Sequence, residues 1–138
     1  LGIIPDDKKV IEDTLNKASN IADIVITTGG VSVGEADYMK DILKKIGEIL
    51  FWKISMKPGR PLAFGKIGKC HYFGLPGNPV STMVTFYQFV REAILTLSGG
   101  GSVPRTWLKS TKAVSPAKLF FSLKFPGFLS GLALISIL

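Results

Sequence analysis

A short β-branched run, residues 22–27, ends in a pair of glycines and lies between two segments with helical periodicity. Its residues are mostly apolar on both faces of the expected strand, which is typical of a strand buried between the helical layers of a parallel sheet. Residues 6–19 before it predict a helix with Asp6 as the N-cap. Residues 37–47 after it predict a second helix, because their apolar side chains recur at i, i+3, i+4 and i+7.

The apolar period falls to two after the second helix. This alternation predicts a strand over residues 50–56 with two unlike faces. Residues 62–64 and 71–75 predict a hairpin, because a glycine-containing turn lies between them.

The last predicted element is a helix that begins after Asn78, a good N-cap, with Pro79 at its first position. It ends at a glycine run after Ser98, and its apolar stripe comprises Val80, Met83, Val84, Tyr87, Val90, Ile94 and Leu97. The order helix, strand, helix, strand, hairpin, helix favours a layered α/β domain over residues 1–100, with a largely parallel sheet.

The residues after this helix break the pattern. Residues 119–138 are rich in Leu, Phe, Ile and Ser, but Lys124 and a Pro-Gly pair interrupt them, and neither period is sustained. A membrane-spanning helix needs about 20 continuous apolar residues. We therefore expect a poorly ordered or non-native tail, and no membrane span.

The composition indicates one compact domain, since 46% of the 138 residues are apolar. The net charge of +7 does not indicate a nucleic-acid partner, because the excess basic residues are scattered through an acid-free tail after residue 100. The single cysteine, Cys70, excludes an intramolecular disulfide and is predicted to be a packing residue. Leu1 opens the sequence without a secretory signal or a start methionine, so we expect a fragment of a cytoplasmic protein.

Three predicted strands end in corners rich in glycine or proline, at the sheet edge where α/β folds bind ligands. The first corner, residues 27–37, joins a glycine pair to a helix start, so its backbone N–H groups and the Ser32 hydroxyl could hold an anion. Glu35 and Asp37 could hold Mg²⁺, which prefers oxygen ligands. Alternatively, both carboxylates only stabilise the helix dipole, or Asp37 is an N-cap.

The second corner, residues 57–61, sets Lys57 and Arg60 on either side of a rigid turn, so both charges could point at one oxyanion. The third corner, residues 75–81, ends a strand and begins a helix, and its free N–H groups with the Ser81 hydroxyl could form an anion site. Alone, the first corner is better explained as an ordinary helix start and the second as a solvated turn, whereas the third is equally well explained as an N-cap. Together they indicate a phosphate or oxyanion site.

Three motifs give a resemblance to a known family. They run from Asp23 to Tyr38 (DIVITTGGVSVGEADY), from Phe51 to Pro61 (FWKISMKPGRP) and from Gly74 to Ser81 (GLPGNPVS), and they occur in the family's order and at similar spacing. Residues 2–99 thereby resemble the central domain of the molybdopterin molybdenumtransferases, the MoeA and gephyrin E-domain family.

The resemblance implies a three-layer α/β/α fold shared with the MogA and MoaB adenylyltransferases. It also implies a reaction in molybdenum cofactor biosynthesis: insertion of molybdate into adenylylated molybdopterin, with Mg²⁺-dependent release of AMP. The implied partners are molybdopterin-AMP, molybdate, a MogA-type adenylyltransferase and, in the full-length family, a second copy of the chain.

Residue roles follow from the matching motifs. Asp37 and Glu35 would be the catalytic carboxylates and the metal ligands. The residues that would line the molybdate and phosphate pocket are Ser32, Lys57, Arg60 and Ser81. Those that would shape the pterin-nucleotide groove are Gly29, Gly30, Pro76, Gly77, Asn78 and Pro79.

The chain also departs from the family pattern. The family's first strand, with its acidic motif, is missing before Leu1, which would leave a sheet edge exposed. Residues 101–138 are expected to be a remnant of the family's C-terminal β-barrel domain or a frameshifted, poorly ordered tail. A MogA-type adenylyltransferase and a non-catalytic binding or scaffold module remain the alternative functions.

Overall fold

A computed structural model describes residues 1–31, 36–100 and 132–137, with the backbone alone for residues 36–38 and 132–137. The elements in chain order are β1 (Gly2–Ile4), α1 (Lys8–Ile21), β2 (Ile24–Thr28), α2 (Ala36–Ile46), β3 (Glu48–Lys53), β4 (Pro61–Ile67), β5 (Cys70–Leu75), α3 (Pro79–Thr85), the π-helical turn η1 (Phe86–Val90), α4 (Arg91–Leu97) and β6 (Leu132–Ile137). None of the described helices is long and apolar enough to cross a membrane.

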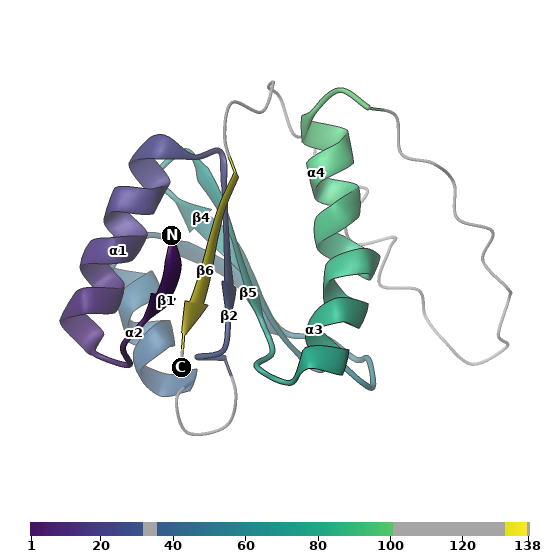
Figure 1. Cartoon of the computed structure of the whole chain (residues 1–138), viewed down its shortest axis with the longest axis horizontal. Helices are drawn as coiled ribbons and strands as arrows, with labels where there is room; N and C mark the ends of the chain where they lie inside the picture. Colours follow the sequence, from purple (N-terminus) through teal and green to yellow (C-terminus); the bar gives the residue numbers. More distant parts are fainter. Residues whose placement is uncertain (32–35, 101–131, 138) are drawn as a thin grey trace, which may run out of the picture.

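The strands form one mixed sheet in the order β1-β6-β2-β5-β4-β3. From β1 to β5 neighbouring strands are parallel, whereas β5, β4 and β3 pair antiparallel. Helices α1 and α2 cover one face and the α3-η1-α4 rod covers the other (Figure 1). The expected three-layer α/β/α fold is therefore confirmed, and the expectation of a largely parallel sheet is confirmed in part, because three of the five strand pairings are parallel.

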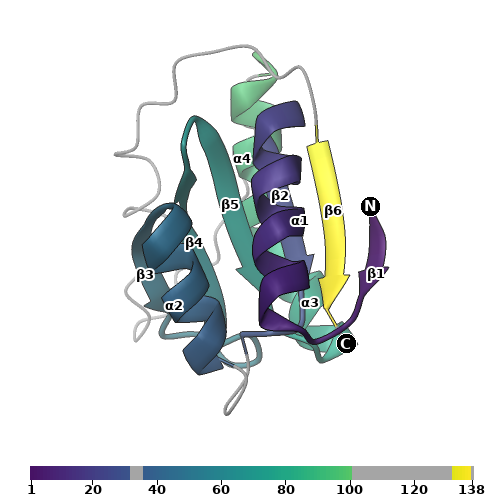
Figure 2. The same ribbon diagram turned by 90° about the vertical axis from the view of Figure 1, so that its left-hand side faces the viewer.

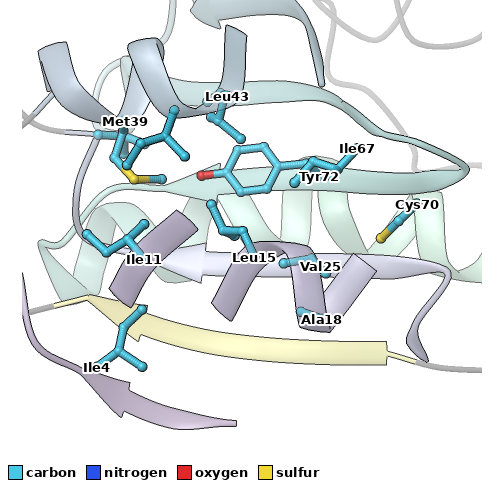
Figure 3. Packing of buried hydrophobic residues seen from close by; sticks show 13 residues of the cluster. Ile4, Ile11, Leu15, Ala18, Val25, Met39, Leu43, Ile67, Cys70 and Tyr72 are labelled. Carbon is cyan, nitrogen blue, oxygen red and sulfur yellow. The ribbon is translucent and has the colours of Figure 1, made fainter. Parts of the chain in front are cut away.

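Two apolar cores lie on the two faces of the sheet. Alternate residues of β2 divide between them: Val25 packs toward α1 and α2, whereas Ile24 and Ile26 pack toward the α3-η1-α4 rod. Figure 3 shows the first core, with the Tyr72 ring between α1 and α2. The continuous apolar run of β2 is explained by burial on both faces.

Helix α1 begins one residue later than it would with Asp6 as its N-cap. Asp7 is the N-cap, and its Oδ1 accepts hydrogen bonds from the backbone N–H groups of Lys9 at 2.9 Å and Val10 at 3.0 Å. The predicted cap was therefore wrong by one position. The Asp7 N–H donates to the Pro5 carbonyl at 2.8 Å, and the turn closed by this bond places Asp7 at the N-terminus of the helix.

The face of the last helix was predicted wrongly in its first half. Val80, Met83 and Tyr87 are 65%, 54% and 49% exposed, whereas Thr85 on the opposite side is fully buried against the sheet. A threonine fits there because its hydroxyl donates to the Ser81 carbonyl at 2.9 Å, which satisfies the buried polar group. Apolar periodicity alone could not indicate this face.

Strand β3 departs from simple alternation. Its pairing with β4 shifts register on both sides of Phe51. Phe51 and Trp52 are both partly buried, and they pack against the two opposite cores. Leu50 is exposed, although the alternation placed it on the face of Trp52.

The end of the chain differs from the expectation of a poorly ordered tail. Residues 132–137 form β6, which pairs parallel with β1 on one side and β2 on the other (Figure 2). The β2 edge that was expected to be exposed is therefore covered. The domain boundary at residue 100 and the origin of the tail stay predictions.

Candidate functional site

The first and third corners lie side by side. Parallel pairing of β2 with β5 sets Thr28 opposite Leu75, and the Gly29 N–H donates to the Leu75 carbonyl at 3.2 Å. A Cβ on Gly77 would lie 3.6 Å from the Cα of Gly29, so the two backbones nearly touch. Gly29 and Gly30 have positive φ angles of 87° and 66°, which favour glycine.

The second corner lies against the third. It contains a cis bond between Lys57 and Pro58, and a Cβ on Gly59 would lie 2.6 Å from the Thr85 side chain and 3.7 Å from the Ser81 carbonyl oxygen. Because β3 runs in the direction of β5, its corner is at the same edge of the sheet. The three corners that the sequence singled out therefore meet at the carboxyl ends of β2, β3 and β5.

The third corner is locked by hydrogen bonds. The Asn78 Oδ1 accepts from the Ser81 N–H at 3.1 Å, which confirms Asn78 as the N-cap with Pro79 at the first helical position. The Thr82 hydroxyl donates both to the Pro76 carbonyl and, at 2.9 Å, to the Asn78 carbonyl. Sequence reasoning missed Thr82, although a hydroxyl residue in the first turn after a cap is a signal for such a bond.

Two basic side chains, those of Lys57 and Arg60, lie at this edge of the sheet. Lys57 and Arg60 are exposed, and in the part of the chain whose side chains are described neither forms an ion pair. The Arg60 carbonyl accepts from the Ile54 N–H at 2.9 Å, which closes the turn. Both exposed side chains are suitable donors to an anion.

The remaining predicted site residues differ in exposure. Gly29, Gly30 and Pro76 are buried, Ser81 is half-buried, and Gly77, Asn78 and Pro79 are exposed. Ser32 and Glu35 lie outside the described residues. Asp37 is the second residue of α2, so it lies inside the first helical turn and is not the N-cap. The catalytic, metal and pocket roles of all these residues stay predictions.

The far end of β5 has different chemistry. Cys70 is buried, and burial raises the pKa of its thiol to about 11. Burial, followed by the Lys66 charge, lowers the pKa of His71. The prediction that Cys70 is a packing residue is confirmed, because a protonated thiol in the core is a poor nucleophile. No cluster of three metal-ligating side chains occurs among the described residues.

Fold and site together define a class. This is an α/β/α domain in which glycine- and proline-rich corners meet beside two exposed basic side chains at the carboxyl ends of its strands, where such folds bind phosphorylated and other anionic ligands. Sequence comparison then gives the family. Residues 1–96 match the family described as "Probable molybdopterin binding domain", and the chain belongs to that family.

The relatives carry related names. The chain is 54% identical over 99 residues to the molybdopterin molybdenumtransferase of Haemophilus influenzae, covering 72% of this chain and 24% of that protein. It is 44% identical over 117 residues to gephyrin of Dictyostelium discoideum, covering 73% of this chain and 16% of that one. The crystal structure of the molybdopterin biosynthesis MoeA protein from Pyrococcus horikosii superposes with a TM-score of 0.61 at 32% identity, over 72% of this chain and 24% of that chain. The chain thus spans a quarter or less of these relatives.

Proposed function

We propose that this chain is the catalytic module of a molybdopterin molybdenumtransferase. As part of a complete enzyme it would act in molybdenum cofactor biosynthesis, inserting molybdate into adenylylated molybdopterin with release of AMP. The observation that carries this proposal is the meeting of three corners beside Lys57 and Arg60. The names of relatives with up to 54% identity support the same reaction.

The two cations would bind the inorganic substrate. Molybdate is a tetrahedral dianion, and Lys, Arg, hydroxyl groups and backbone N–H groups are suitable donors to its oxygens. Lys57 and Arg60 supply charge from the second corner, and Ser81 supplies a hydroxyl from α3, which touches that corner through Gly59. Ser32, which follows the first corner, would complete the set.

The glycines would form the floor of the pterin-nucleotide groove. Gly77 is exposed and has no side chain, and the buried Gly29 lies directly beside it, so a flat ligand would contact the backbone at this point. The rigid Pro76-Gly77-Asn78-Pro79 turn would fix the wall of the groove with little ordering cost.

Magnesium would be held by Asp37, with Glu35 as a second candidate. Asp37 lies at the start of α2, the helix that follows the β2 corner, and carboxylate oxygens are the protein ligands that Mg²⁺ prefers. When bound, the ion would neutralise phosphate charge during loss of AMP. Lys57 and Arg60 would add to this by orienting the departing anion.

The partners follow from the same proposal. A MogA-type adenylyltransferase would supply the adenylylated pterin, and the free thiol Cys70 fits a reducing compartment such as the cytoplasm. A homodimer is supported by the uncharged apolar stripe of Val80, Met83, Val84 and Tyr87, because a row of exposed apolar residues on a helix is typical of a covered surface.

A chimaera tests the catalytic proposal. Residues 1–99 of this chain would replace the matching segment of the Haemophilus influenzae relative, and formation of molybdenum cofactor from purified adenylylated pterin and molybdate would be measured. We expect activity, and its loss on Asp37→Asn. Asp41→Asn on the exposed side of α2 is the matched control and should stay active.

The alternatives predict different results. A chimaera that folds like the relative and binds AMP without inserting molybdate would favour a non-catalytic binding module. Adenylyl transfer from ATP to molybdopterin would favour a MogA-type enzyme. Full activity of Asp37→Asn would remove Asp37 from the mechanism.

A further inference from the structure

The second corner contains one buried residue in an otherwise exposed turn. Gly59 is buried, whereas Lys57 and Arg60 on either side of it are exposed. The Gly59 φ angle of 100° favours glycine, and a Cβ at this position would lie 2.6 Å from the Thr85 Cγ2. The turn that carries both basic side chains therefore packs directly against the Thr85 methyl group.

The Thr85 side chain is also bonded to the helix that carries Ser81. It is fully buried, and its hydroxyl donates to the Ser81 carbonyl at 2.9 Å and to the Thr82 carbonyl at 3.0 Å. Because these bonds hold the hydroxyl against the helix, the methyl group on the same Cβ is directed at Gly59. One side chain thus joins the second corner to the first turn of α3.

The π-helical turn η1 accounts for the direction of Thr85, in the rod that covers one face of the sheet (Figure 1). Residues about seven apart share a face of a continuous α-helix, so the burial of Val90 would turn Met83 toward the sheet. The Arg91 N–H instead donates to the Phe86 carbonyl, an i→i+5 bond that adds one residue to the turn. With this extra residue, Met83 is 54% exposed and Thr85 is buried.

We propose that Thr85 is a positioning residue for the molybdate site, an inference that rests on the proposed function. Its methyl group sets how closely the second corner lies against α3, and thereby the separation between the Lys57 and Arg60 side chains and the Ser81 hydroxyl. Because Thr85 is fully buried, it acts through these neighbours and does not touch the anion. Donors that converge on one tetrahedral anion lose affinity when one of them is displaced.

Two conservative variants of the full chain separate the methyl group from the hydroxyl. Thr85→Ser keeps both hydrogen bonds and removes the methyl group that meets Gly59, whereas Thr85→Val keeps a methyl group there and removes the hydroxyl. Thr96→Ser is the matched control, because the exposed Thr96 hydroxyl donates to the Glu92 carbonyl at 2.8 Å in the same local pattern. Calorimetric titration measures molybdate binding, and thermal unfolding is measured on the same proteins.

We expect Thr85→Ser to bind molybdate at least about ten-fold more weakly than the wild type, since small displacements of positioned groups are costly. Thr85→Val and Thr96→Ser should retain the wild-type affinity. Both Thr85 variants should unfold at lower temperature, because each loses a buried methyl group or a hydrogen bond. A merely structural role would weaken binding equally in both Thr85 variants, and that outcome, or normal binding by Thr85→Ser, overturns the proposal.

Gly59→Ala tests the contact from the other side. A Cβ at residue 59 meets the Thr85 methyl group in the wild type, but it can occupy the space left by that group in Thr85→Ser. The Met56 Cε, 2.8 Å from the same point, is the end of a flexible side chain and can move. The strain of the positive φ angle is the same in both backgrounds and cancels in a double-mutant cycle. Gly59→Ala should therefore weaken molybdate binding less in Thr85→Ser than in the wild type, and equal losses contradict the role of the contact.

Amide hydrogen exchange gives a readout without a ligand. The Ile54 N–H donates to the Arg60 carbonyl at 2.9 Å and closes the second corner, so it should exchange faster in Thr85→Ser than in Thr85→Val or the wild type. The Gly29 N–H, bonded to the Leu75 carbonyl at the first corner, should exchange at an unchanged rate. Failure of the wild type to bind molybdate would count against the proposed function. Unchanged Ile54 exchange in Thr85→Ser would overturn the positioning role of Thr85 alone.

Discussion

The hydroxyl oxygens of Thr27 and Tyr72 lie 2.8 Å apart in the buried core and join β2 to β5 at Thr27, the first residue of the first corner. The bond is possible because Gly74, opposite Thr27, has no side chain: a Cβ there would lie 2.8 Å from the Tyr72 hydroxyl. Burial raises the pKa of Tyr72, so the phenol stays protonated, and one hydroxyl of the pair donates the hydrogen bond that the other accepts.

Removing one partner of this bond should destabilise the fold. Tyr72→Phe leaves the Thr27 hydroxyl buried without its partner, which costs about 1–3 kcal/mol in the free energy of unfolding. Urea unfolding of the chain measures the change. The double variant Tyr72→Phe with Thr27→Val should recover most of the loss, because both polar groups are then absent. Additive losses in the double variant would show that the bond does not contribute.

Gly74 and Gly77 should respond differently to alanine. A Cβ at Gly74 would also lie 2.8 Å from the Val31 side chain and 3.1 Å from the Ala63 Cβ, so Gly74→Ala overpacks the core and should cost about 1–3 kcal/mol. At Gly77 the only close atom among the described residues is the Gly29 Cα at 3.6 Å, an ordinary contact. Gly77→Ala should therefore leave thermal unfolding unchanged and weaken AMP binding by narrowing the groove. Equal unfolding midpoints for the two variants would refute the packing argument.

Much of this arrangement was predictable from the sequence, and the reasons for the exceptions are physical. Strand β2, helix α2 and the cap at Asn78 carry strong local signals, since burial on both faces, amphipathic spacing and a capping side chain each act within a few residues. The meeting of the three corners followed from strand direction alone. The exposed stripe on α3 was not predictable, because Thr85 is buried beside the turn at Gly59, which is a tertiary contact, whereas its hydroxyl bonds to Ser81 and Thr82 are local.

Strand β6 was unpredictable for a different reason. A short apolar run has no period long enough to identify it, and its partners β1 and β2 lie at the other end of the sequence. The candidate site shows the same division. Its backbone frame was predictable, whereas the roles of Ser32, Glu35 and Asp37 stay predictions.

The exposed cations Lys57 and Arg60 should control anion binding. Lys57→Ala and Arg60→Ala each remove charge-assisted hydrogen bonds worth about 1.5–3 kcal/mol, so molybdate and AMP should bind at least about ten-fold more weakly. Lys69→Ala, in the exposed turn between β4 and β5, is the matched control and should bind normally. Calorimetric titration at two salt concentrations checks this, and an equal effect of Lys69→Ala would indicate only a non-specific loss of charge.

The buried thiol should make stability fall at alkaline pH. Burial raises the pKa of Cys70 from 9.0 to about 11, so the folded chain holds the thiol proton more tightly than the unfolded chain. Its contribution is fully present below pH 9 and is lost as pH rises toward 11. Urea unfolding between these values should show the decline, and Cys70→Ala should reduce it. Iodoacetamide should label the native thiol slowly at pH 8 and the urea-unfolded thiol rapidly; fast native labelling would contradict the burial.

The exposed stripe on α3 and η1 should drive self-association. Val80, Met83, Val84 and Tyr87 are spaced so that they line one side of the helix, and no charged residue lies between Pro79 and Val90 to oppose pairing with the same surface of a second copy. Met83→Lys places a charge in the middle of the stripe and should shift sedimentation toward monomer. Ile21→Lys, at an equally exposed apolar residue on α1, is the control and should leave association unchanged. Because α1 lies on the other face of the sheet, an equal shift in both variants would mean that added charge, and not this surface, governs association.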